Sequence, residues 1–199
     1  MAKKRKIPKF LFDALLIVIS VLFALFINEW RSNINKNNET EVILNNIELE
    51  LKNNLESAKR LRKYHKKIRD NIYKAYESDS LESTFFDEQV FSIYKVAPNG
   101  LLQEDFGNIA WEVARQENIS SRIDFKTSRL LFKAYDQQES VLSTLSELLS
   151  LFDERETQRI EHLEESVTIF GRHLMEAVGQ EQNMIIYYER ALKQLSKDH

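Results

Sequence analysis

The sequence predicts an all-α protein, in which an N-terminal transmembrane helix continues into the long helix of an extracytoplasmic antiparallel helical bundle. Three observations indicate this fold: an apolar run near the N-terminus, heptad repeats of apolar residues further along, and a scarcity of chain-breaking residues. The whole chain of 199 residues contains only 4 Gly and 2 Pro. So few breakers favour helices over a sandwich or barrel rich in turns.

The apolar run covers residues 10–27, and its only polar members are Asp13 and Ser20. A helix of that length spans about 27 Å, close to the hydrocarbon thickness of a bilayer. Its apolar side chains cover the full circumference, so it lacks the polar face of a soluble core helix. A cleaved signal peptide would need small residues at alternate positions after the run, which this sequence lacks. We therefore expect an uncleaved signal anchor over residues 10–30.

The flanks of the run predict its orientation. The preceding tail, residues 1–9, holds the basic residues Lys3, Lys4, Arg5, Lys6 and Lys9. The 18 residues that follow the run hold only Arg31 and Lys36 as basic residues. Basic flanks stay in the cytoplasm, so we expect a bacterial inner-membrane protein with a cytoplasmic N-terminus and a periplasmic domain over residues 31–199. Asn28 and Trp30 then mark the outer end, where a Trp ring suits the membrane interface.

Asp13 has two interpretations. Near the start of the helix and four residues from Lys9, its carboxylate can cap free backbone N–H groups at headgroup depth. Alternatively, it carries protons or ions, as in stator-like subunits of ion-coupled membrane complexes with one span and an aspartate in its inner half. The residues favour the cap, because an acid near the end of a span reaches water easily.

Two stripes of apolar residues predict the long helices of the exported domain. The first follows a heptad pattern and predicts a helix over about 31–78; its members are Leu44, Ile47, Leu51, Asn54, Ala58, Leu61, His65, Ile68, Ile72 and Ala75. The second runs from Leu142 to Ala177, with Glu156 as its polar interruption, and predicts a helix over about 139–178. We expect the two to bury their stripes against each other, antiparallel.

Shorter elements fill the remaining chain. We expect short helices near residues 84–95, 106–117 and 124–138, with Asp124 capping the third. Gly179 marks a break before a last short helix over about 180–195.

Catalytic signatures are missing from the sequence. It has no Cys, no Gly-rich phosphate loop and no nucleophile elbow. The His-x-x-Glu pairs at His162 and His173 lie about 16 Å apart on a helix, too far to share one ion. We therefore expect no enzyme, no cofactor and no metal site.

The clearest charge feature is the basic run of residues 59–69, which has no acid; it comprises Lys59, Arg60, Arg62, Lys63, Lys66, Lys67 and Arg69. A straight helix puts it about 50 Å from the anchor, beyond the reach of lipid charge. Nucleic acid is not expected outside the cytoplasm. The run either faces acids of the last long helix, among them Glu154, Glu161, Glu164 and Glu165, or forms an interaction patch for an anionic partner; charge runs favour the former.

Two segments resemble a family. The anchor ending Ala24, Leu25, Ile27, Asn28 and Trp30 resembles the Ala-Leu-x-Ile-Asn-x-Trp ending of small bacterial single-span inner-membrane proteins that share a domain of unknown function. A second segment is also similar; its matching residues are Ala110, Trp111, Glu112, Ala114, Ile119, Asp124, Leu130, Tyr135 and Gln138. The resemblance implies a bacterial origin and one membrane span, and no activity.

The sequence thus predicts a membrane-anchored periplasmic bundle that acts through protein–protein interaction, by self-association or with another envelope protein, without catalysis. A stator-like subunit using Asp13 is one alternative. A ligand-sensing bundle that signals through a partner is the other, and it requires a polar cavity between helices.

Overall fold

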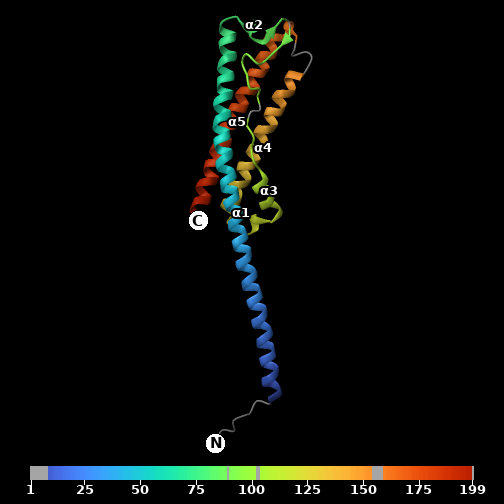
Figure 1. The fold of residues 1–199 in the computed structure, drawn as a ribbon, viewed down its shortest axis with the longest axis vertical. Helices are drawn as coiled ribbons and strands as arrows, with labels where there is room; N and C mark the ends of the chain where they lie inside the picture. Colours follow the sequence, from blue (N-terminus) through green and yellow to red (C-terminus); the bar gives the residue numbers. More distant parts are fainter. Residues whose placement is uncertain (1–8, 89, 102–103, 154–158, 199) are drawn as a thin grey trace. The chain divides into compact units, whose positions relative to one another are not determined.

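The computed structural model describes residues 9–88, 90–101, 104–153 and 159–198 (Figure 1). Its helices are α1 (Lys9–Glu77), α2 (Leu81–Phe85), α3 (Ile109–Gln116), α4 (Phe125–Asp153) and α5 (Leu163–Asp198). Short 3-10 turns, η1 (Ile119–Ser121) and η2 (Ile160–His162), and a hairpin of β1 (Phe86–Asp87) and β2 (Val90–Phe91) complete the elements. The predicted all-α class is confirmed.

The chain forms two compact units, residues 1–43 and residues 44–199. In the first unit the described chain is a single helical segment, because no Pro or Gly interrupts it after Lys9. The helix continues through Trp30 and on to Glu77. The prediction that the apolar helix runs directly into a long helix is therefore confirmed.

The core of the second unit follows the predicted stripe of α1. Every member of the stripe from Ile47 to Ala75 is buried, and Leu44 alone is half-buried. Asn54 and His65 are the polar members, and they are 2% and 0% exposed. Buried polar groups need hydrogen-bond partners, so these two positions point to polar contacts between the helices.

Hydrogen bonds fix the directions of the three long helices in this unit. Tyr76 and His65 of α1 contact Glu164 and Glu181 of α5, so α1 and α5 are antiparallel. Asn54 of α1 contacts Gln138 of α4, and the earlier residue Glu50 contacts the earlier residue Tyr135, so α1 and α4 are parallel. Figure 1 shows α4 and α5 alongside the cyan and green part of α1.

The predicted helix over residues 139–178 is wrong, because α4 ends at Asp153 and α5 begins at Leu163. Arg159 has an extended backbone, with φ −95° and ψ 135°. Each helix buries an apolar stripe of its own, and in both stripes buried residues recur three or four positions apart. Between the two stripes the sequence has seven consecutive polar residues, 153–159, which include no Gly or Pro.

Two further predictions about boundaries are wrong. Gly179 does not end a helix, since α5 runs through it to Asp198, and a Cβ there would meet nothing within 4 Å. The segment 84–95 is not a helix, because α2 ends at Phe85 and the β1–β2 hairpin follows. Buried Phe85 and Phe86 sit on opposite sides of that transition.

The starts of the two remaining helices agree with the structure. The helix expected near 106–117 is α3, whereas the one expected over 124–138 does not end at residue 138, because α4 continues to Asp153. Asp124 caps α4: its carboxylate accepts from the backbone N–H groups of Lys126 at 2.8 Å and Thr127 at 3.1 Å. These bonds, together with one to the Thr127 side chain, lower the pKa of Asp124.

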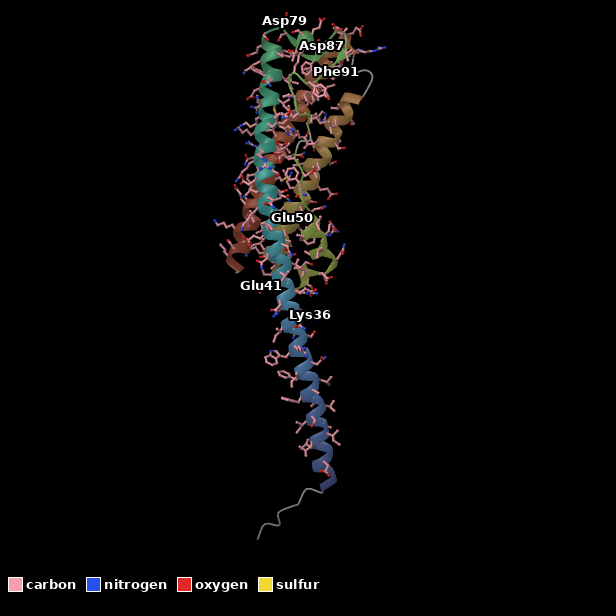
Figure 2. All side chains as sticks on the ribbon, viewed as in Figure 1. Lys36, Glu41, Glu50, Asp79, Asp87 and Phe91 are labelled. Carbon is pink, nitrogen blue, oxygen red and sulfur yellow. The ribbon has the colours of Figure 1, made fainter. Side chains whose placement is uncertain are left out.

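An aromatic cluster closes one end of this unit. Phe85, Phe86 and Phe91 pack on Ile68 and Ile72 of α1 and on the start of α5. The rings of Phe86 and Phe91 meet edge to face, with centroids 5.7 Å apart. Figure 2 shows Asp87 and Phe91 at the same end as Asp79, whereas Glu50 lies away from that end.

Candidate functional site

The N-terminal unit presents an apolar surface on all sides of α1. Its large apolar side chains between Leu15 and Ile27 are each 44% or more exposed, as is Trp30 at 61%. Over this stretch α1 is long and apolar enough to cross a membrane. Ser20, the polar residue within it, donates its hydroxyl proton to the carbonyl of Leu16 at 2.8 Å. That bond removes an unsatisfied polar group from the apolar surface.

The predicted orientation residues are only partly described. Lys3, Lys4, Arg5 and Lys6 lie outside the described residues, and Lys9 is the first residue of α1. Asp13 is exposed on the first turns of α1. Asn28 lines a shallow hollow with Arg31 and Lys36 on the polar part of the helix that follows the apolar stretch.

A basic hollow lies on α1 in the second unit. It measures about 470 Å³, and its lining consists of Lys59, Arg62, Lys63, Lys66, Lys67, Asp70, Asn71, Lys74 and, from α5, Ile185. Its cations follow one another at steps of one, three or seven residues along the helix, over about 22 Å from Lys59 to Lys74. The structure thus gathers most of the predicted interaction patch into one concave surface and adds Lys74 to it.

The remaining basic residues of the run are neutralised locally. Arg60 makes a bidentate contact with Glu104, at 2.8 and 2.7 Å, and this lowers the pKa of that carboxyl. Arg69 contacts Asp70 at 2.7 Å. Lys59, which does line the hollow, is also paired, with Glu56 at 3.0 Å.

The expected pairing of the run with acids of the last long helix does not appear in the part of the chain that the structure describes. There, no ion pair joins the run to Glu161, Glu164 or Glu165. Glu164 instead accepts a hydrogen bond from the Tyr76 hydroxyl at 2.8 Å. Glu154 and Glu156 lie outside the described residues.

A fully buried His–Glu pair joins α1 to α5. Nδ1 of His65 is hydrogen-bonded to Oε1 of Glu181, and both side chains are 0% exposed. The other ring nitrogen, Nε2, lies 2.8 Å from the carbonyl oxygen of Leu101. A carbonyl only accepts, so Nε2 carries a proton and donates it. Nδ1 and Glu181 therefore share one further proton, which either an imidazolium or a neutral carboxyl group holds.

Glu50 of α1 holds α3 in place. Its carboxylate accepts from the backbone N–H of Ala110 at 2.9 Å and from the Tyr135 hydroxyl at 2.6 Å. Asn108, at the N-cap of α3, makes no side-chain capping bond, so Glu50 satisfies that helix end from another helix. Burial, aided by Glu50, raises the pKa of Tyr135 well above its ordinary value of 10, which keeps the hydroxyl a donor.

An adjacent network links all three long helices. The Asn54 side chain pairs with the backbone of Gly107 through N–H···O contacts of 2.8 and 2.7 Å. Gln138 of α4 accepts from Asn54 at 3.1 Å and from the Tyr188 hydroxyl of α5 at 2.7 Å. Burial raises the pKa of Tyr188, so it too remains protonated. These buried contacts fix the positions of the three helices relative to one another.

Sequence reasoning missed Glu50 and Glu181. Glu181 was detectable, because the buried residues of α5 follow steps of three and four through it; they are Leu174, Ala177, Glu181, Met184, Tyr188, Ala191 and Leu195. An acid within such a stripe indicates a buried partner. Glu50 is half-buried beside the stripe of α1, and nothing in the pattern distinguishes it from neighbouring surface acids.

Within the described ranges, no group of three or more His, Cys, Asp and Glu side chains could hold a metal ion. No curated protein and no solved structure is detectably similar to the chain. The N-terminal part does have a match, which includes the resembling residues that end at Trp30 and stops before the second resembling segment. Residues 13–101 are similar to a family of unknown function, DUF6090.

Proposed function

We propose that this chain is a bacterial inner-membrane protein, anchored by residues 10–30, whose periplasmic bundle binds an acidic surface of another envelope protein through the basic hollow. The anchor assignment rests on the apolar, exposed surface of α1 between Leu15 and Ile27. Such a surface is far larger than a soluble monomer leaves exposed to water.

The basic hollow is the observation that carries the proposed binding role. Five of its cations have no acid within ion-pair distance in the described part of the chain: Arg62, Lys63, Lys66, Lys67 and Lys74. The single acid of the hollow, Asp70, already contacts Arg69. The hollow is therefore a concentrated positive surface on a chain whose net charge is −3. An acidic partner would be steered to it and would recover the missing ion pairs.

Site-specific crosslinking in cells tests this role. A photo-reactive residue at Lys63 should yield a discrete adduct with another envelope protein, identified by mass spectrometry after mild-detergent purification. The same residue at Asn53, also exposed on α1, is the matched control and should yield none.

Charge reversal supplies a second test. With the photo-reactive residue kept at Lys63, Lys67→Glu with Lys74→Glu should abolish the adduct, whereas Lys126→Glu with Lys193→Glu, at exposed positions elsewhere, should preserve it. The adduct should also weaken as ionic strength rises, because exposed charges are screened. If the only adducts join two copies of this chain, the hollow serves self-association, and the proposed envelope partner is wrong. An adduct that survives reversal would contradict the role of the hollow.

A further inference from the structure

A cavity opens between α3, η1 and the first turns of α4, and no charge run or heptad pattern marks it in the sequence. Its volume is about 250 Å³. Its floor consists of Trp111, Ile119 and Leu131, which are at most 8% exposed. Protein interiors contain few voids larger than one water molecule, which occupies about 30 Å³ in the liquid, so this space exceeds a packing defect.

Two aromatic side chains, Trp111 and Phe132, form one wall of the cavity and pack against neighbouring rings. The ring of Trp111 stacks on Tyr135 with centroids 4.9 Å apart and an interplanar angle of 3°. Phe132 meets the same indole edge to face, at 4.8 Å and 88°. Phe132 is 47% exposed, so the wall extends from the buried floor to the surface. A flat ring entering here gains aromatic contacts without any rearrangement of the wall.

The polar groups of the cavity favour an anion. Among the described residues that line it, Arg115 is the sole charged one. Glu112 engages this guanidinium through one contact of 3.3 Å, whereas a guanidinium carries five N–H donors. Deeper inside, Ser128 also lines the cavity and is only 8% exposed. A cation would be repelled by Arg115, and a polymer would not fit the volume.

We propose that this cavity binds a small aromatic carboxylate, whose ring lies against Trp111 and Phe132 and whose carboxylate is held by Arg115. The site is independent of the basic hollow, which is formed by other residues of α1 and α5. The volume lies just below the roughly 300–1,000 Å³ of pockets for drug-sized ligands, so the ligand has about ten to twelve heavy atoms.

Tryptophan fluorescence of the full chain in detergent tests the proposal. The protein has two Trp residues, so Trp30→Phe leaves Trp111 as the only reporter. In this background, 3-phenylpropionate should change the emission saturably, with a Kd of about 0.1–1 mM. The neutral amide of the same probe should bind about tenfold more weakly, because it lacks a charge-assisted hydrogen bond.

Two variants assign the signal to the cavity. Arg115→Met should weaken binding of the acid by about tenfold and leave binding of the amide unchanged. Lys126→Met removes an exposed charge on the first turn of α4 that does not line the cavity. This variant should change neither the affinity for the acid nor the affinity for the amide. Ala114 also lines the cavity and is 3% exposed, so Ala114→Phe should fill the cavity and abolish the response, with circular dichroism verifying that the helices remain folded.

Three results would overturn the proposal. The first is the absence of a saturable response to the acid at about 10 mM, ten times the weakest expected Kd, in the folded Trp30→Phe chain. The second is equal affinity for acid and amide. The third is an equal loss in Arg115→Met and Lys126→Met. Because Arg115 is exposed, its replacement tests the site without disturbing the core.

Discussion

Nδ1 of His65 on α1 and Oε1 of Glu181 on α5 share a completely buried hydrogen bond. Each residue occupies a position in the apolar stripe of its helix, where a sliding of one helix along the other would place it against hydrocarbon. The contact therefore specifies the register of α1 against α5, which is the best-attested role of a buried polar pair.

Breaking this pair on one side should be costly. We expect His65→Leu to lower the free energy of unfolding by about 3–5 kcal/mol, because Glu181 then stays buried without a partner. The double variant His65→Leu with Glu181→Leu should recover most of that loss. Denaturant unfolding of the full chain in detergent, followed by circular dichroism, measures both. A double variant as unstable as His65→Leu would contradict this explanation.

The sequence predicts the position of His65 but not its contact with Glu181. The heptad pattern of α1 places His65 on the buried seam, and the structure confirms it. Its partner, Glu181, lies 116 residues away on α5, and the apolar pattern predicted the wrong start for that helix. The contact itself therefore could not be predicted from the sequence. Local periodicity encodes which face of a helix is buried, whereas the turns decide which faces meet.

Removal of the Tyr135 hydroxyl should weaken the attachment of α3. Tyr135→Phe keeps the ring stacked on Trp111 but removes the 2.6 Å bond to Glu50. We expect a loss of about 1.5–3 kcal/mol, as for hydrogen bonds to charged groups. Tyr94→Phe is the control, since Tyr94 is 69% exposed, and it should change stability by less than about 0.5 kcal/mol. Equal effects of the two variants in denaturant unfolding would exclude a special role for the Glu50 contact.

Two glycines should respond oppositely to replacement by alanine. A Cβ at Gly107 would lie 3.1 Å from Cγ of Glu50 and 3.2 Å from its Oε2. Glu50 would have to shift away from α3, so Gly107→Ala should destabilise by about 1–3 kcal/mol. A Cβ at Gly179 meets nothing within 4 Å, so Gly179→Ala should stabilise α5 by about 0.5–1 kcal/mol. Thermal unfolding of both variants checks the signs; a destabilised Gly179→Ala would mean that this position needs glycine.

The cap of α4 should lose its effect in acid. The folded-state pKa of Asp124 lies below its ordinary value of 3.8, so its stabilising contribution is present above that pH and is lost as pH falls through the lower value. Asp124→Ala should therefore melt below the wild-type protein at about pH 7, and the difference should disappear as the pH falls below the lowered pKa of Asp124. Asp124→Asn retains an acceptor oxygen without titrating. The melting temperature of Asp124→Asn should stay close to that of the wild type at neutral pH. If Asp124→Ala lowers the melting temperature by the same amount at every pH, the proposed role of the carboxylate is wrong.

The same cap explains why some boundaries were predictable and others were not. Asp124 indicates the start of α4, because a short side chain that can accept hydrogen bonds from backbone N–H groups stands directly before a periodic apolar stripe. The end of α4 carries no comparable signal, since residues 153–159 are polar but include no Gly or Pro. The cavity beside Trp111 could not be predicted from the sequence either, because it depends on how η1 packs between α3 and α4.

Lysine substitutions at two isoleucines of α1 test whether the apolar run is inserted in a membrane. Ile19 lies at the middle of the apolar run and Ile34 beyond it, and they are 52% and 43% exposed. In water, a lysine at either position of an exposed helix would be tolerated equally. In a bilayer, Ile19→Lys places a charge at the centre of the span, at a cost of about 2.5–3.5 kcal/mol. We expect Ile19→Lys to reduce the membrane-bound fraction in carbonate-washed membranes, and Ile34→Lys to leave it unchanged. Equal retention of both variants would mean that residues 10–30 do not span the bilayer, and that their apolar surface is covered by protein instead.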